Sequence, residues 1–170
     1  AVVCTTGLSN ELIDKLRKSS ESVALLKSAN MSVGVNLIMN LVKKAAEALY
    51  DSGFDIEILE KHHNQKIDAP SGTAIAIADS INEALDNKLN YVYDRSQVRE
   101  KRTRDQLGIS AIRGGTIVGE HDVIFAGKDE VITLSHQAMS KEIFAVGAVK
   151  AAKFLVGKPA GMYTMKNVLE

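Results

Sequence analysis

The apolar residues of the chain recur with two different periods, which together predict a mixture of helices and strands. Apolar side chains return every three or four positions in four segments, a spacing typical of helices with one buried face. These segments are residues 10–18, 33–51, 70–85 and 140–156. Ser9 precedes the first segment as a typical N-cap, while Gly53 and Gly157 follow the second and the fourth as typical helix ends.

A second set of segments shows alternating apolar and polar positions or short apolar runs, which predicts β-strands. The predicted strands are residues 1–3, 23–26, 54–59, 108–113, 116–126 and 130–137, with Glu60 and His62 continuing one face of the third. Gly114-Gly115 and residues 127–129 separate the last three strands and predict two hairpin turns. Residues 87–106 are polar and irregular, which predicts a long loop.

This order of elements predicts an α+β fold, with a mixed, mostly antiparallel open sheet and helices on one face. The opening strand, helix and strand are typical of a parallel βαβ unit, so we expect a short remnant of a Rossmann-type βαβ domain before the sheet. Because a domain rarely begins on a buried strand, Ala1-Val2-Val3 indicates sequence upstream of Ala1, unless only an initiator methionine was removed.

The composition of the 170 residues narrows the class of protein. Hydrophobic residues make up 45%, enough for a core, and 21 basic side chains balance 21 acidic ones, which does not favour nucleic acid or an anionic membrane as partner. No apolar run has the length of a membrane span. The single cysteine, Cys4, excludes an internal disulfide framework and fits a reducing compartment, so we expect a cytoplasmic protein.

Residues 60–74, with the sequence EKHHNQKIDAPSGTA, concentrate the groups that can carry chemistry. His62 or His63 can donate a proton near neutral pH, and Lys66 supplies a positive charge. Ser71, Gly72 and Thr73 begin a predicted helix, whose unpaired N–H groups suit a carboxylate or a phosphate. Together these groups predict a site for a small dianion that is protonated during a reaction.

Two other interpretations of this segment compete with that one. Paired histidines are often surface decoration, and Pro-Ser-Gly-Thr also caps a helix that binds nothing. A metal site is the other chemical alternative, with Glu60, His62, His63 and Asp68 as ligands. Adjacent histidines on a strand point to opposite faces, however, and no zinc spacing is present, so we expect no metal. We interpret His121 and His136 as structural. Arg113, near the Gly-Gly turn, could approach the site, but we assign it no role.

The segment 60–74 resembles dihydrodipicolinate reductases, because it matches their pattern E-x-H-H-x-x-K-x-D-A-P-S-G-T-A at every fixed position. Further blocks similar to that family are residues 5–7, Asn30 with residues 32–34, and Gly114 with residues 118–121. The resemblance implies reduction of a cyclic imine dicarboxylate to tetrahydrodipicolinate in lysine and diaminopimelate biosynthesis, with hydride from NADH or NADPH.

The resemblance also implies residue roles. His62 falls on the proton donor and Lys66 on a second position that contacts the substrate and donates a proton. The implied carboxylate-binding residues are His63, Ser71, Gly72, Thr73 and Thr6. The implied nicotinamide-binding residues are Cys4, Thr5, Thr6, Ser28, Ala29, Asn30 and Met31, with Cys4 standing where the family usually has glycine. No G-x-G-x-x-G turn follows a strand in these residues, so the NADH or NADPH preference is not readable.

The resemblance further implies three parts: a remnant of the dinucleotide-binding domain at 1–32, a substrate-binding, catalytic and oligomerisation domain at 33–157, and a C-terminal tail at 158–170 that packs back toward the nucleotide-binding part. It implies a homotetramer formed through the sheet. Apolar residues expected to serve a second sheet face are Val118, Ile124, Ile132 and Leu134. We expect this chain to be inactive alone. The alternative is a non-catalytic module that binds dicarboxylate and forms tetramers.

Overall fold

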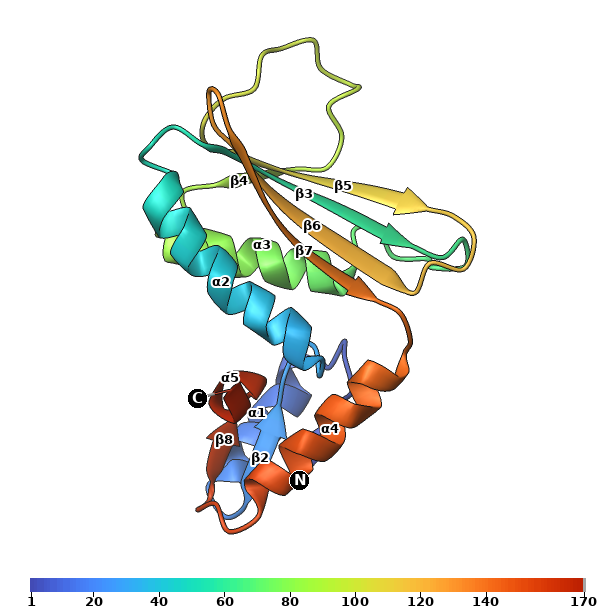
Figure 1. The fold of residues 1–170 in the computed structure, drawn as a ribbon. Helices are drawn as coiled ribbons and strands as arrows, with labels where there is room; N and C mark the ends of the chain where they lie inside the picture. The colour runs from blue at the N-terminus through green and yellow to red at the C-terminus, as the bar shows by residue number, and fades with distance from the viewer. Residues whose placement is uncertain (170) are drawn as a thin grey trace. The chain divides into compact units, whose positions relative to one another are not determined.

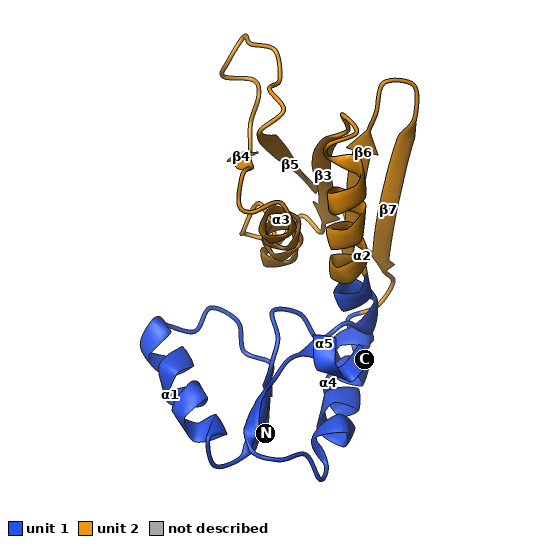
Figure 2. Ribbon diagram, turned by 90° about the vertical axis from the view of Figure 1, so that its left-hand side faces the viewer, with its two compact units in different colours: residues 1–37, 141–170 blue, residues 38–140 orange. Residues whose placement is uncertain are grey.

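The computed structural model describes residues 1–169 as two compact units (Figures 1 and 2). Unit 1 joins residues 1–37 to the chain from residue 141 onwards, and unit 2 is Ile38–Ser140. These boundaries differ from the predicted ones, since the helix near 140–156 groups with the N-terminal segment. Within residues 1–169, no helix has both the length and the hydrophobicity needed to cross a membrane.

Unit 1 is built on a small parallel sheet with the strand order β1-β2-β8. Its elements are β1 (Val2–Val3), α1 (Asn10–Ser20), β2 (Ala24–Lys27), the first residues of α2 (Val33–Leu49), α4 (Glu142–Leu155), β8 (Gly161–Tyr163) and α5 (Met165–Leu169). The expected parallel βαβ arrangement is confirmed by β1, α1 and β2. The predicted tail at 158–170 contains β8, which pairs with β2.

Unit 2 is a five-stranded mixed sheet with helices on one face, which confirms the α+β class (Figure 1). Its elements are the rest of α2, β3 (Asp55–His62), α3 (Gly72–Ala84), β4 (Asn90–Val92), β5 (Gln106–Arg113), β6 (Gly119–Ala126) and β7 (Val131–Ala138). The strand order is β4-β5-β3-β6-β7. Pairs β4–β5 and β5–β3 are parallel, whereas β3–β6 and β6–β7 are antiparallel. The sheet is therefore mixed, with two parallel and two antiparallel strand pairs.

The predicted hairpin at Gly114-Gly115 is wrong, because β5 and β6 lie on opposite sides of β3 instead of pairing with each other. The connection crosses the end of β3 and bonds to it, with Gly114 N–H donating to His62 O over 2.9 Å and Asn64 N–H donating to Gly115 O over 3.2 Å. The second predicted hairpin, at residues 127–129, is confirmed by the antiparallel pair β6–β7. The predicted loop at 87–106 contains the short strand β4.

The register also corrects the assignment of apolar residues to a second sheet face. Leu134 pairs with Val123, and Ile132 with Phe125, both of which are buried. Because paired residues project to the same side of a sheet, Ile132 and Leu134 lie on the helix-covered face. Of the four apolar residues expected on the face without helices, Ile124 is the one that lies in a strand and projects to that face.

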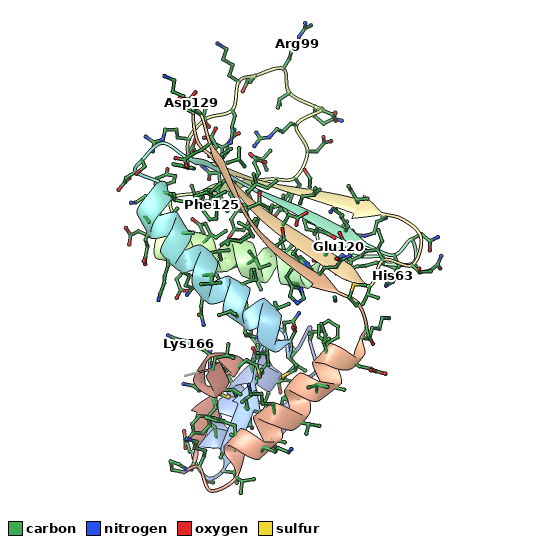
Figure 3. The ribbon with its side chains drawn as sticks, in the orientation of Figure 1. His63, Arg99, Glu120, Phe125, Asp129 and Lys166 are labelled. Atoms are coloured by element: carbon green, nitrogen blue, oxygen red, sulfur yellow. The ribbon has the colours of Figure 1, made fainter. Side chains whose placement is uncertain are left out.

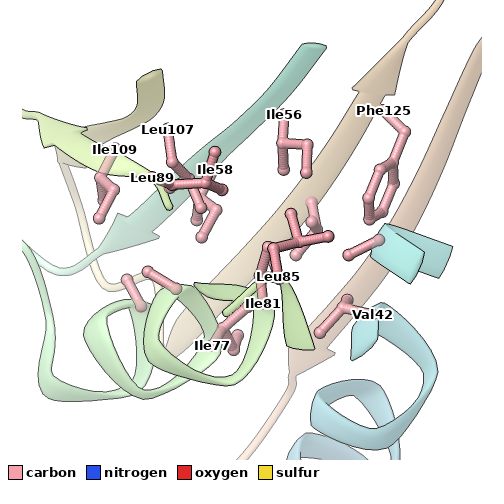
Figure 4. Packing of buried hydrophobic residues seen from close by; sticks show 14 of the residues in the cluster. Val42, Ile56, Ile58, Ile77, Ile81, Leu85, Leu89, Leu107, Ile109 and Phe125 are labelled. Carbon is pink, nitrogen blue, oxygen red and sulfur yellow. The ribbon is translucent and has the colours of Figure 1, made fainter. Parts of the chain in front are cut away.

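The core of unit 2 explains how β3 carries polar groups into the interior. Ile56 and Ile58 alternate with half-buried positions and pack against the α3 residues Ile77 and Ile81 (Figure 4). Each such isoleucine contributes about 2–3 kcal/mol when fully buried. The same period of two continues to Glu60 and His62, which are therefore also buried. Hydrophobic packing of the first half of the strand fixes the direction of the polar second half.

Candidate active site

Glu60 is the most deeply buried charged group of the site, with 0% of the residue exposed. Its Oε1 accepts from Arg113 Nη2 at 2.6 Å and from the Ser71 N–H at 2.9 Å. Its Oε2 accepts from Arg113 Nη1 at 2.7 Å and lies 2.6 Å from His62 Nδ1. Burial raises the pKa of Glu60, but the bonds from Arg113, His62 and Ser71 outweigh it and hold the pKa below the usual carboxyl value. Glu60 is therefore ionised at neutral pH.

Arg113 reaches Glu60 from the neighbouring strand. It ends β5, and its register partner in the parallel pair is His62. Besides the two bonds to Glu60, Nη2 donates to the Asp68 carbonyl oxygen over 2.7 Å. Arg113 thereby ties the loop after β3 to the strand. Sequence reasoning left this arginine without a role because its partner is 53 residues away along the chain.

His62 is fixed by Glu60 on one side of its ring. An ionised carboxylate only accepts hydrogen bonds. The proton therefore sits on His62 Nδ1, which donates it in the hydrogen bond to Glu60. No hydrogen bond from residues 1–169 engages Nε2, and 11% of the side chain is exposed. Burial lowers the pKa of His62 below its usual value; Glu60 opposes this, while Lys66 and Arg113 add to it.

Ser71 joins the histidines to the start of α3. Its Oγ accepts from the Ala74 N–H at 3.1 Å as the helix N-cap and lies 3.0 Å from His121 Nε2. The His121 ring also meets the His62 ring edge-on, with centroids 5.2 Å apart. Burial lowers the pKa of His121 to about 4, with a further contribution from His62, so this imidazole is neutral at pH 7. His121, which we interpreted as structural, thus lies in contact with the candidate proton donor.

Lys66 and Asp68 follow β3 in the loop that leads to α3. Lys66 Nζ donates to both Asp68 carboxylate oxygens, at 2.7 and 2.9 Å. Lys66 is the main cause that lowers the pKa of Asp68; burial opposes it, and the Gly72 N–H assists. An anionic group thus already lies between the lysine and the first residue of α3. This corner of the structure accommodates a carboxylate.

The remaining candidates in unit 2 lie in the same segment. His63 is half-buried and directly follows β3. The end of β3 lies there beside the start of β6, where Glu120 is the first residue on the face away from the helices (Figure 3). Gly72 is exposed, and Thr73 is half-buried in the first turn of α3. The structure thus brings His62, His63, Lys66 and residues 71–73 to one end of the sheet of unit 2.

The predicted nicotinamide-binding residues lie in unit 1, after two neighbouring parallel strands. Cys4, Thr5 and Thr6 are exposed and follow β1, while residues 28–31 follow β2. Asn36 holds the second loop by donating from Nδ2 to the Asn30 carbonyl at 2.8 Å. The carboxyl ends of adjacent parallel strands are the usual place for a dinucleotide in such sheets, so these loops fit a nicotinamide group. The Met31 side chain is buried in the core of unit 1.

Groups of three or more His, Cys, Asp or Glu side chains arranged to hold a metal ion are absent from residues 1–169. Three of the four side chains considered as metal ligands are engaged in hydrogen bonds within the protein. Glu60 bonds to both His62 and Arg113, and Asp68 is engaged by Lys66.

Comparisons with known proteins show the family of this chain. The sequence model of the family described as "Dihydrodipicolinate reductase, C-terminus" matches residues 34–169. The chain belongs to the dihydrodipicolinate reductase family. It is 56% identical over 169 residues to 4-hydroxy-tetrahydrodipicolinate reductase from Caldanaerobacter subterraneus subsp. tengcongensis, covering 99% of this chain and 66% of that relative. It is 53% identical over 168 residues to the protein of the same name from Clostridium tetani, covering 99% and 65%.

A solved structure shares the fold. Dipicolinate-bound dihydrodipicolinate reductase from Paenisporosarcina sp. TG-14 superposes with a TM-score of 0.73 at 23% identity, covering 96% of this chain and 62% of that one. The resemblance found in residues 60–74 is thus confirmed at the level of the family. The chain spans about two thirds of the length of the relatives it matches.

Proposed function

We propose that this chain is the substrate-binding and catalytic part of a 4-hydroxy-tetrahydrodipicolinate reductase of lysine and diaminopimelate biosynthesis. One observation carries the proposal: His62 is bonded to ionised Glu60 through Nδ1, while Nε2 has no partner within residues 1–169. The ring shares one end of the sheet with Lys66 and the start of α3. A proton donor beside groups that bind an anion matches reduction of an unsaturated dicarboxylate.

The substrate would be a small cyclic dicarboxylate. Lys66 supplies the positive charge, and the exposed Gly72 and the neighbouring Thr73 supply groups of the first turn of α3. His63 adds an imidazole at the end of β3. Ser71 contributes by holding the start of the helix, because its N–H and Oγ are engaged by Glu60, Ala74 and His121. The dipicolinate held by the Paenisporosarcina reductase supports this class of ligand.

The cofactor would be NADH or NADPH, which supplies hydride when bound. Residues 4–6 and 28–31 would hold its nicotinamide part. Lys66 stabilises the negative charge that develops on the substrate during reduction. His62 first takes up a second proton on Nε2 from solvent, then transfers it to the ring carbon that becomes electron-rich and returns to the neutral imidazole. The chain's own contribution is therefore to bind, orient and protonate the substrate.

Calorimetry with pyridine-2,6-dicarboxylate and with NADH, each titrated separately, tests this proposal. We expect dicarboxylate heat that disappears when pyridine-2-carboxylate is used, because only the dianion satisfies both carboxylate contacts. Absence of dicarboxylate binding would contradict the proposal. Saturable NADH binding together with turnover would show an active chain, whereas dicarboxylate binding without turnover would support the alternative, a non-catalytic binding and tetramerisation module.

A homotetramer formed through the open face of the sheet of unit 2 is part of the proposal. That face carries Lys61, which pairs with Glu120 at 3.0 Å and with Asp122 at 3.2 Å, and it includes Ile124. A face with both apolar and oppositely charged groups suits contact with a second copy of the same face, since in an isologous contact a residue i of one copy meets a residue j of the other, and j meets i. Light scattering measures the assembly, and a monomeric mass would contradict it.

A further inference from the structure

We propose that Glu60 and Arg113 are positioning residues for His62, and that Gly119 keeps space open at the other side of its ring. This inference rests on the proposed function, in which His62 donates the proton. The bond between Glu60 Oε2 and His62 Nδ1, 2.6 Å long, is buried and links two side chains on the same face of β3. The carboxylate itself does not reach solvent.

The charge of Glu60 decides which nitrogen of His62 acts. A buried carboxyl without partners tends to take up a proton, and a protonated carboxyl could donate to Nδ1. The two bonds from the Arg113 guanidinium keep Glu60 anionic, so that it only accepts. The neutral imidazole then carries its proton on Nδ1, and Nε2 is the position left for the second, transferable proton. Arg113 thus acts on His62 through Glu60.

Gly119 borders the opposite edge of the ring. A Cβ built on Gly119 would lie 3.0 Å from His62 Nε2 and 3.3 Å from Cδ2, which is closer than ordinary contact. The first residue of β6 therefore leaves just enough room for the nitrogen that we assign as the donor. Glu60 and Gly119 constrain the ring from two sides, independently of each other.

The charged and titratable groups around His62 come from every element that borders it. Glu60 lies on β3, Arg113 on β5, His121 on β6, and Lys66 in the loop before α3. Glu60 is the anionic group among them and raises the pKa of His62 against the effect of burial. Replacing it with glutamine removes this charge and lowers the pKa of His62 further. The amide can donate as well as accept, so it no longer fixes the proton on Nδ1.

Nuclear magnetic resonance of the chain with ¹⁵N-labelled histidine tests the inference, because long-range ¹H–¹⁵N couplings distinguish imidazoles protonated on Nδ1 from those protonated on Nε2. At about pH 8, where a histidine is neutral, we expect His62 with its proton on Nδ1. In Glu60→Gln we expect loss of this single form and a His62 titration shifted to lower pH. Glu120→Gln, the same change on the open face of the sheet, leaves both unchanged.

A wild-type His62 protonated on Nε2, or a Glu60→Gln spectrum identical to wild type, would overturn the positioning role. The wild-type spectrum alone decides the tautomer, even when Glu60→Gln does not fold.

Gly119→Ala adds a second test: we expect shifted His62 resonances and weaker dipicolinate binding, whereas Gly114→Ala, with nothing within 4 Å of the added Cβ, has neither effect. Unchanged His62 signals in Gly119→Ala would refute the spacing role. If the wild-type chain binds no dipicolinate, the proposed function is contradicted, while the result on the His62 tautomer remains valid.

Discussion

The backbone N–H of Ser71 donates to Oε1 of Glu60 over 2.9 Å, which joins the first turn of α3 to the last residues of β3. The start of α3 and the imidazole of His62 are therefore held by one carboxylate. Movement of either element disturbs the other, because Glu60 has no exposed surface on which water could replace a lost partner.

Replacing Ser71 with alanine separates helix capping from ligand binding. We expect Ser71→Ala to lower the free energy of unfolding by about 1 kcal/mol, as is usual for a lost N-cap, and to weaken dipicolinate binding because the start of α3 loosens. Ser9→Ala removes the N-cap of α1, whose side chain accepts from Leu12, and serves as the control. It lowers stability without changing affinity. Equal affinities of the two variants would contradict the role of Ser71 at the site.

In the proposed site, Lys66 supplies the positive charge that a dicarboxylate requires. We expect Lys66→Met to weaken dipicolinate binding by roughly 10-fold or more, since a charge-assisted hydrogen bond contributes about 1.5–3 kcal/mol. Calorimetry at two salt concentrations measures this loss, and the salt dependence of binding falls with it. Lys88→Met removes another lysine paired with an aspartate two residues away and leaves the affinity unchanged. An undiminished affinity in Lys66→Met would exclude the lysine from the site.

The buried pair Glu60–Arg113 is expected to contribute more to stability than a surface ion pair. Arg113→Met leaves the Glu60 carboxylate buried without its main counter-charge, which costs about 3–5 kcal/mol. Urea denaturation measures this. Lys43→Met breaks the exposed pair with Glu83 and is expected to cost less than about 1 kcal/mol. A loss in Arg113→Met no larger than that in Lys43→Met would show that the pair does not hold Glu60 in place.

His121 makes stability depend on pH. Burial lowers its folded pKa to about 4 from the usual 6.5, so the unfolded chain binds the proton more readily. The contribution of neutral His121 to the free energy of unfolding is therefore fully present above pH 6.5. It is lost as the pH falls from 6.5 to 4, which lowers the free energy of unfolding by about 3 kcal/mol. The lowered pKa values of His62 and His136 act in the same direction. His121→Asn is expected to reduce this slope; an unchanged slope would contradict the burial of a neutral His121.

His62 tests the catalytic proposal directly. In a protein that joins this chain to the nucleotide-binding part of a full-length relative, His62→Gln is expected to lower turnover by about 100-fold or more, as loss of a general acid does. Dipicolinate affinity falls much less, because Lys66 and α3 remain. Steady-state kinetics and calorimetry on the same preparation give both quantities. Equal losses of turnover and affinity would argue for a binding role instead.

Local patterns in the sequence predicted the helices, most strands and the family to which residues 60–74 point. The helix predicted at 33–51 is observed as α2, Val33–Leu49, because its apolar positions repeat with the helical period over several turns. The motif segment predicted a strand end followed by a helix start, and Ser71 caps α3 as its residue type suggests. Such features depend on neighbours within a few positions, so the order of residues is sufficient to reveal them.

Pairing between distant segments was decided by the tertiary structure alone. Nothing in the residues of β5 and β6 states that β3 lies between them, since glycines separating two strands are equally compatible with a hairpin and with a crossover. That arrangement places Arg113 and His121 on the two sides of Glu60, from 53 and 61 residues along the chain. A buried carboxylate requires hydrogen-bond partners. Local patterns do not reveal which residues supply them or from which strand, because the packing of the sheet against α2 and α3 decides this.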